Sequence, residues 1–220
     1  QRVRKAVTPP GDAQEDSWII AHIAARMGYP MPYEYNQVLK EINELTPSYA
    51  GITPERLEVQ TLTWPCPDVD HSGTQILHVG NFSRGRGQFS NIDHLPPAKQ
   101  TESDYPLILT TRGVLQHYLT GTMTRQGRGL NRLYPELLAE INPQDAKTLK
   151  ILDGDMMSIT SRRGTTKVKA WICDRPSPGV VFVPFHFHES PINALTNTAL
   201  DPVAKIPEYK VCAVSIQKVA

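Results

Sequence analysis

Two helices are predicted in the first fifty residues by apolar positions that recur with a helical period. Apolar side chains return at a spacing near 3.6 residues between Asp16 and Met27, and again between Tyr35 and Leu45. Gly28 is a stop signal after the first run, and Pro47 prevents the second from continuing. The chain therefore opens with a helical segment.

Proline and glycine interrupt the pattern from Thr53 to Pro97, and no period of either kind is sustained there. We interpret this stretch as an extended connector. A short strand pair is plausible around Arg84–Gly87, because apolar residues at 76–79 precede these glycines and residues 88–90 follow them. The spacing of the glycines favours a turn over a phosphate-binding loop.

The pattern becomes β-rich after Pro106. Short runs of β-branched and apolar residues, each bounded by Gly, Pro, Asp or Asn, predict strands at Leu107–Thr111, Met156–Ser161, Thr166–Ile172, Val180–Pro184 and Tyr209–Ile216. A hairpin turn is predicted at Arg163-Gly164. Short helices are predicted at 134–140 and at 143–149, and Asn142 with Pro143 marks the start of the second.

These elements predict a mixed α and β fold, in which a helical N-terminal segment precedes a β-barrel with inserted short helices. Short strands that alternate irregularly with short helices argue against a doubly wound parallel sheet. The absence of the usual Gly-rich phosphate motifs also argues against a Rossmann or P-loop enzyme.

Composition adds little to this picture. Hydrophobic residues make up 40% of the chain and charged residues 20%, with a formal net charge of +1, so no overall field favours nucleic acid as a partner. No apolar run approaches the roughly 18 residues that cross a bilayer, so membrane insertion is not expected. The three cysteines form no C-x-x-C pair and favour a reducing compartment, the cytoplasm.

Three segments carry candidate chemistry. The first, residues 110–125, follows a predicted strand and is rich in hydroxyls, glycines and arginines, the donors that a diphosphate and a purine edge require. An ordinary polar surface loop is an equal alternative for this composition. The second holds His186 and His188 beside Glu189, but a third metal ligand at diagnostic spacing is missing. We interpret these histidines as lining or flanking a pocket.

The third segment, residues 193–210, places an amide, hydroxyls and a lysine among prolines. Such a rigid, turn-rich stretch suits recognition of a heterocycle with many donors and acceptors. A capped loop leading to the last strand is an equally good interpretation from the residues alone.

In this order and spacing, the three segments resemble the C-terminal dinucleotide-binding domain of the bis-molybdopterin oxidoreductases, which include formate dehydrogenases and nitrate reductases. The resemblance covers nearly the whole chain. It is most specific in HYLTGTMTR (117–125), FVPFHFHESPINALT (182–196) and ALTNTALDPVAKIPEYKVCAV (194–214). The last stretch and MGYPMPY (27–33) look like formate dehydrogenase in particular.

The resemblance implies a double-psi β-barrel at 101–220, preceded at 1–100 by a helical segment and connector from the enzyme's preceding domain. It also implies a molybdenum or tungsten bis-molybdopterin guanine dinucleotide cofactor. Phe185 would face the substrate funnel. The implied cofactor contacts are Thr111, Arg112, Gly113, Val114, Leu115, Gln116, His117, Tyr118, Thr120, Asn193, Tyr209 and Lys210.

No catalytic residue and no metal ligand is assigned to this chain. By the resemblance, the metal-ligating Cys or selenocysteine, its neighbouring His and Arg, and the ligands of a [4Fe–4S] cluster lie in upstream segments. We therefore expect the chain, which starts at Gln1, to be part of a longer polypeptide or to pair with a separate one, and to be inactive alone. The expected partners are those domains, iron–sulfur or diaphorase electron-transfer subunits, and formate or CO2. The alternatives are a nitrate reductase of the same superfamily and a β-barrel binding module without a redox role.

Overall fold

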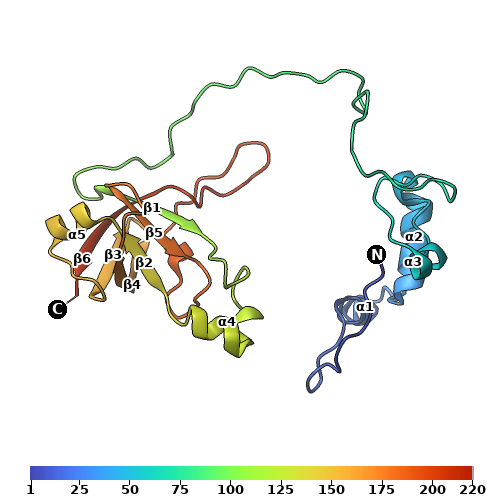
Figure 1. The fold of residues 1–220 in the computed structure, drawn as a ribbon, viewed down its shortest axis with the longest axis horizontal. Coiled ribbons are helices and arrows are strands. Elements are labelled where there is room, and N and C mark those ends of the chain that lie inside the picture. Colours follow the sequence, from blue (N-terminus) through green and yellow to red (C-terminus); the bar gives the residue numbers. More distant parts are fainter. Residues whose placement is uncertain (220) are drawn as a thin grey trace. The chain divides into compact units, whose positions relative to one another are not determined.

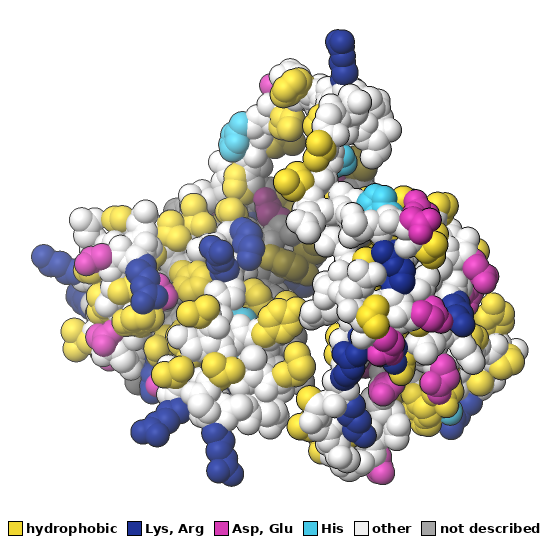
Figure 2. Space-filling view, turned by 45° about the vertical axis from the view of Figure 1, so that its right-hand side comes forward, with side chains coloured by type: hydrophobic (Ala, Val, Ile, Leu, Met, Phe, Trp, Pro, Cys, Tyr) yellow, Lys and Arg dark blue, Asp and Glu magenta, His cyan; other side chains and the backbone are white. Residues whose placement is uncertain are grey.

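The structure is a computed structural model that describes residues 1–219 of the chain (Figure 1). The chain divides into two compact units, Gln1–Asn91 and Ile92–Ala220. Each unit is described by itself. None of the helices within the described residues is both long and apolar enough to span a membrane. On the face seen in Figure 2, charged side chains of both signs are interspersed with apolar ones, in keeping with the small net charge.

The first unit is helical. Helices α1 (Asp16–Arg26) and α2 (Tyr35–Leu45) confirm the two periodic predictions, and a 3₁₀ turn, η1 (Pro47–Tyr49), follows α2. Helix α3 (Pro54–Val59) lies within the stretch that we interpreted as a connector. Its start signals are ordinary ones, since Pro54 opens the helix and the Thr53 hydroxyl accepts a hydrogen bond from the Arg56 amide at 3.3 Å. Its six residues are too few to establish a period.

The core of this first unit is small and depends on one guanidinium group. Ile52, Leu62 and Cys66 are buried together. Beside them, Arg56 donates to the carbonyl oxygens of Gly51 at 2.6 Å and of His71 at 2.7 Å. One side chain thus joins the backbone at Gly51 to the backbone at His71, and it satisfies carbonyl groups that would otherwise be desolvated without partners.

The strand pair predicted around the arginine–glycine repeat is wrong. Only an isolated bridge forms there, in which Phe82 and Gly85 exchange backbone hydrogen bonds of 3.0 and 2.8 Å across a tight turn. Gly85 has φ +90°, a conformation that a glycine adopts without a steric penalty. The flanking apolar residues continue no ladder, because a lone two-stranded ribbon without a covering layer is marginal in water.

The second unit is a closed six-stranded barrel with the order β1-β5-β2-β4-β3-β6. Its strands are β1 (Leu107–Arg112), β2 (Leu138–Ile141), β3 (Met156–Ser161), β4 (Gly164–Ile172), β5 (Val180–Pro184) and β6 (Cys212–Lys218). Strand β1 is parallel to β5, β2 is parallel to β4, and the other four pairs are antiparallel.

The barrel has an internal pseudo-twofold symmetry. If β1 is exchanged with β4, β2 with β5 and β3 with β6, each strand pair maps onto a pair of the same kind, parallel or antiparallel. This is the arrangement of a double-psi β-barrel, so the predicted fold class is confirmed. The predicted hairpin is also confirmed, because Ser161 pairs with Gly164 across the β3–β4 turn.

Between β1 and β3 the helices differ in part from the prediction. Helix α5 (Pro143–Leu149) is confirmed, and the Asn142 side chain caps it by accepting from the Gln144 amide at 2.9 Å. The helix predicted at 134–140 is wrong: α4 (Arg128–Leu133) precedes this stretch, and β2 occupies its end. Residues 138–141 are extended because they insert between β4 and β5, and this pairing outweighs their local helical preference.

The barrel encloses one continuous apolar core. The strand residues that point inward are fully or almost fully buried, while their neighbours alternate to the outside. The most completely buried of these side chains are Leu109, Met157, Ile159, Val181, Val183 and Val214. Strand β6 begins at Cys212, three residues later than predicted, because its ladder with β1 starts where Cys212 lies opposite Leu109.

Candidate functional site

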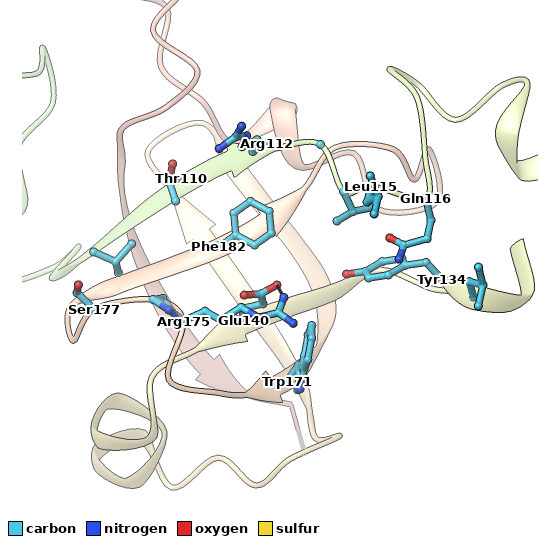
Figure 3. A pocket seen from close by; sticks show the side chains of 15 residues that line it. Thr110, Arg112, Leu115, Gln116, Tyr134, Glu140, Trp171, Arg175, Ser177 and Phe182 are labelled. Atoms are coloured by element: carbon cyan, nitrogen blue, oxygen red, sulfur yellow. Dashed lines mark hydrogen bonds and ion pairs between the residues drawn. The ribbon is translucent and has the colours of Figure 1, made fainter. Parts of the chain in front are cut away.

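An outward-facing row of side chains crosses four strands of the barrel. By strand register, Thr110 lies beside Phe182, Phe182 beside Glu140, and Glu140 beside Trp171. The row lines a cavity of about 780 Å³, whose wall is completed by residues 112–116, 133–134 and 175–177 (Figure 3). Sheet register thus joins residues that are up to 72 positions apart in the sequence, Thr110 and Phe182, into one surface.

A buried carboxylate and an aromatic-stacked arginine lie at this cavity. The Arg175 guanidinium lies over the Trp171 ring at 4.4 Å and donates to Glu140 Oε1 at 2.9 Å. The Glu140 side chain is only 5% exposed, whereas that of Arg175 is 65% exposed. The carboxylate therefore depends on one solvent-facing partner for most of its charge compensation.

Tyr134 lines the same cavity, and its ring points toward the Glu140 carboxylate (Figure 3). Within residues 1–219 its buried hydroxyl has no hydrogen-bond partner. Burial raises the pKa of Tyr134 to about 12, and the charge of Glu140 adds to this effect while Arg175 opposes it. The phenol is therefore a neutral donor at physiological pH, directed into the cavity.

Replacing Arg175 with Met is expected to lower the free energy of unfolding by about 1–2 kcal/mol, because it leaves the buried Glu140 carboxylate without its cation. Chemical denaturation followed by the fluorescence of Trp171, in a Trp18→Phe, Trp64→Phe background, would measure this. Adding Glu140→Gln to Arg175→Met should restore most of the lost stability. An equal loss in the single and the double variant would contradict this account.

Hydrogen bonds of His117, which is 5% exposed, attach the segment after β1 to the barrel. His117 Nε2 donates to the Tyr134 carbonyl oxygen at 2.7 Å. His117 Nδ1 lies 3.2 Å from the Thr124 hydroxyl, which itself accepts from the Tyr118 amide at 3.2 Å. One imidazole thus contacts both Thr124 and Tyr134, which are ten positions apart, and both of its nitrogen atoms are occupied within the protein.

His186 holds the same segment from the other side. This residue, which lies two positions after the end of β5, is 1% exposed, and its Nε2 accepts a hydrogen bond from the Val114 amide at 2.9 Å. Its Nδ1 donates a hydrogen bond to the Leu119 carbonyl oxygen. Burial lowers the pKa of His186 and the nearby His117 contributes in the same direction, while the bond to Leu119 opposes them.

The end of β1 is joined to the segment before β6. The Thr111 hydroxyl donates to the Tyr209 carbonyl oxygen at 2.9 Å, and the Thr111 carbonyl oxygen accepts from Lys210 Nζ at 2.6 Å. Lys210 Nζ also lies 5.9 Å from the centre of the Phe185 ring. The structure therefore brings four of the predicted site residues into contact, although as many as 99 positions separate two of them.

The second segment that we considered for metal binding has another role. Glu189 is paired with Arg125, whose Nη1 donates to Oε2 at 2.8 Å, and the Arg125 guanidinium lies 4.6 Å from the Phe187 ring centre. His188 is exposed beside this pair. Within residues 1–219, no three His, Cys, Asp or Glu side chains are grouped so that they could hold a metal ion.

The Arg125–Glu189 pair should make the free energy of unfolding depend on pH in the acid range. Hydrogen bonds from Arg125 lower the pKa of Glu189 from 4.5 to about 2. A lowered pKa means that the stabilisation is complete above pH 4.5 and is lost as the pH falls toward 2. Glu189 is half exposed, so we expect about 1 kcal/mol or less. Unfolding free energies of the unchanged chain and Glu189→Gln, measured from pH 6 to pH 3, should converge as the pH falls. A constant difference would contradict the pairing.

Comparison with known proteins identifies the barrel. Residues 107–213 match the family model described as the molydopterin dinucleotide binding domain. This part of the chain belongs to that family. The match runs from the start of β1 to the start of β6, and it contains the row of side chains at the cavity, both buried histidines and all of the predicted site residues.

The whole chain has relatives among larger enzymes. It is 48% identical over 224 residues to the F420-dependent formate dehydrogenase subunit alpha of Methanocaldococcus jannaschii, with 100% of this chain and 33% of that protein covered. It is 36% identical to the assimilatory nitrate reductase catalytic subunit of Bacillus subtilis, with 97% and 32% covered. The chain thus spans about a third of the length of these relatives.

A solved structure agrees with the fold. Acetylene hydratase from Pelobacter acetylenicus superimposes with a TM-score of 0.67 at 17% identity, covering 98% of this chain and 34% of that one. At this identity the likeness concerns the fold alone.

Within the molydopterin dinucleotide binding domain, the predicted contact residues differ in exposure. Thr111 and His117 are buried, whereas the side chains of Leu115 and Tyr118 are 98% and 61% exposed, and Asn193 is exposed on a short 3₁₀ turn, η3 (Ile192–Ala194). Sequence reasoning did not find the cavity residues Tyr134, Glu140, Trp171 and Arg175. No local motif marks them, because only the strand pairing brings them together.

Proposed function

We propose that this chain is the C-terminal, cofactor-binding part of a formate dehydrogenase catalytic subunit. In this proposal residues 101–220 form the cofactor-binding domain and residues 1–100 the helical segment and connector before it. The 48% identity to a formate dehydrogenase alpha subunit over the whole chain carries the proposal. The 36% identity to a nitrate reductase keeps that enzyme as the second candidate.

The donors at the end of β1 fit an anionic dinucleotide. Arg112 lines the cavity, and Lys210 donates a hydrogen bond to the carbonyl oxygen of Thr111, the residue before Arg112. Two cations therefore flank Thr111. Beyond them, the exposed hydroxyl groups of Thr120 and Thr122 and the exposed amide of Asn193 offer neutral donors and acceptors. Guanidinium, ammonium and hydroxyl groups are the side chains that bind a diphosphate without covalent attachment.

We propose that Arg112 and Lys210 bind the charged part of a bis-molybdopterin guanine dinucleotide, while the exposed side chains of residues 113–120 follow its uncharged surface. When bound, the molybdenum or tungsten group would supply the redox chemistry of formate oxidation or CO2 reduction. The residues of this chain then bind and orient the group and exclude water from it. Phe185, held beside Lys210, would face the substrate funnel.

The partners that follow from this proposal are the remaining domains of the catalytic subunit, which would supply the metal ligand and the [4Fe–4S] cluster, and an iron–sulfur or diaphorase electron-transfer subunit. A cytoplasmic location fits the three free cysteines, of which Cys66 and Cys212 are buried.

The proposal is tested on the complete polypeptide that carries this chain, purified from a host that makes the pterin. We expect metal with two pterin guanine dinucleotides per catalytic unit, and formate-dependent reduction of an artificial dye. Turnover of nitrate without formate would move the assignment to the second candidate. Absence of both metal and pterin would leave a barrel that serves as a binding module.

Replacing Lys210 or Asn193 with Ala in that polypeptide should lower the retained metal and pterin several-fold, because both side chains are proposed ligands outside the core. The free energy of unfolding should change by about 1 kcal/mol or less. Lys147→Ala, at an exposed position of α5, is the matched control and should leave both properties unchanged. Full metal occupancy in both test variants would refute the assignment of these two ligands.

A further inference from the structure

His186 contacts both ends of the segment that follows β1. Its Nε2 accepts from the Val114 amide at 2.9 Å, and its Nδ1 bonds to the Leu119 carbonyl oxygen. Because a carbonyl oxygen can only accept, Nδ1 must carry the proton, and because an amide can only donate, Nε2 must be free of one. The partners thus fix a single neutral tautomer of a side chain that is 1% exposed.

We propose that His186 is a positioning residue, which holds residues 114–119 in the one backbone shape that presents their outward side chains to the dinucleotide. This inference rests on the proposed function in that it takes this segment as the cofactor-binding surface. His186 itself is enclosed, so it acts through the backbone of the segment and does not contact the ligand.

The local geometry is built around this ring. At Gly113, an added Cβ would lie 3.3 Å from both Cε1 and Nε2 of His186, so the glycine allows the backbone to approach the imidazole closely. Leu119 has φ +46°, a left-handed conformation that costs a leucine free energy. Its carbonyl oxygen is the one that His186 binds, so the strained residue is fixed by the ring.

The side chains between the two bonds differ in exposure. Leu115 and Tyr118 are 98% and 61% exposed, whereas His117, in the same stretch, turns inward to the Tyr134 carbonyl oxygen. A backbone held at Val114 and Leu119, and through the inward-facing His117, fixes the directions in which the Cα–Cβ bonds of the remaining residues leave it. Such pre-organisation lowers the conformational entropy that is lost when a ligand binds.

Two substitutions separate the two bonds of His186. The amide group of a glutamine reaches the position of Nε2, and its oxygen can accept a hydrogen bond from the Val114 amide. The glutamine has no group at the position of Nδ1, so the Leu119 carbonyl oxygen loses its donor. The shorter asparagine reaches the position of Nδ1 and can donate to the Leu119 carbonyl oxygen, but it leaves Val114 without an acceptor. His186→Gln and His186→Asn are therefore complementary, and both retain a polar group of moderate size in the barrel wall.

The first measurement is hydrogen exchange, resolved to single amides, on the complete polypeptide made in a host that lacks the pterin. We expect the Val114 amide to exchange about five- to tenfold faster in His186→Asn than in His186→Gln, because one hydrogen bond of about 1 kcal/mol is lost only in the former. His188→Gln, at the exposed neighbouring histidine, should leave this amide unchanged. Equal exchange of Val114 in the Asn and Gln variants would overturn the proposal.

The second measurement is metal and pterin content of the same variants in a host that makes the pterin. Both His186 variants should retain several-fold less cofactor than His188→Gln, while the core amides of β1 and β3 exchange at unchanged rates. Unchanged cofactor retention with a loosened segment would overturn the positioning role. If the unchanged polypeptide contains no pterin, the proposed function fails, whereas the exchange result remains valid because it needs no cofactor.

Discussion

Replacing Leu109 with Ala is expected to lower the free energy of unfolding of the barrel by about 2–5 kcal/mol. Leu109 is fully buried at the centre of β1, where it lies opposite Val181 on one side and Cys212 on the other. The truncation removes apolar contacts and leaves a cavity that strands held on both sides cannot close. Urea denaturation in a Trp18→Phe, Trp64→Phe background leaves Trp171 as the fluorescent reporter of the barrel.

Leu115→Ala is the matched control for this prediction. It removes the same atoms from a leucine that is 98% exposed, so the free energy of unfolding should change by about 0.5 kcal/mol or less. Similar losses for Leu109→Ala and Leu115→Ala would mean that the barrel interior is not the core on which this unit depends. A smaller m-value in Leu109→Ala would show that the unfolded or native ensemble had changed as well.

Gly121→Ala is expected to destabilise the barrel by about 2–4 kcal/mol and to displace the segment after β1. Gly121 has φ +74°, which a side chain rarely adopts. An added Cβ would also lie 2.8 Å from the His186 carbonyl oxygen and 2.8 Å from Cδ of Arg125. The arginine side chain can move, but the backbone oxygen cannot, so the segment itself must shift.

Gly154→Ala provides the control for the backbone conformation. Gly154 has φ +81°, but an added Cβ would meet nothing within 4 Å, so this variant should lose only about 1 kcal/mol from the left-handed backbone. The difference between the two variants measures the cost of the close contacts with the His186 carbonyl oxygen and the Arg125 side chain. In the complete polypeptide, Gly121→Ala should also retain less metal and pterin than Gly154→Ala. Equal stability and equal retention would show that the segment tolerates movement at Gly121.

The elements that the sequence predicted well are those whose signals are local. Apolar positions at helical spacing located α1 and α2, and alternation bounded by turn residues located β1, β3 and β5. Asn142 followed by Pro143 marked the start of α5, and the hydrogen bond from the Gln144 amide confirms that cap. In each case the residues that specify the element lie within it or directly beside it.

The candidate site was predictable only in part. The density of glycine, hydroxyl and guanidinium groups in the sequence indicated residues 110–125 as a binding segment. The resemblance carried by HYLTGTMTR (117–125) and by residues 194–214 indicated which cofactor would bind there. The sequence did not show that the side chains of Thr111 and His117 turn inward while those of Leu115 and Tyr118 turn outward. The contacts proposed for these residues stay predictions until cofactor retention is measured.

By itself, the sequence determined the helical start of the chain, the β-rich second half and the segment in which binding groups are concentrated, because periodicity, caps and turn residues act over a few positions. Only the tertiary structure decided that residues 138–141 are extended, and that Glu140, Trp171 and Arg175 share one cavity wall. Their proximity follows from the register between β2, β4 and β5. Strand register is set by which apolar faces close the barrel together, and that choice depends on all six strands at once.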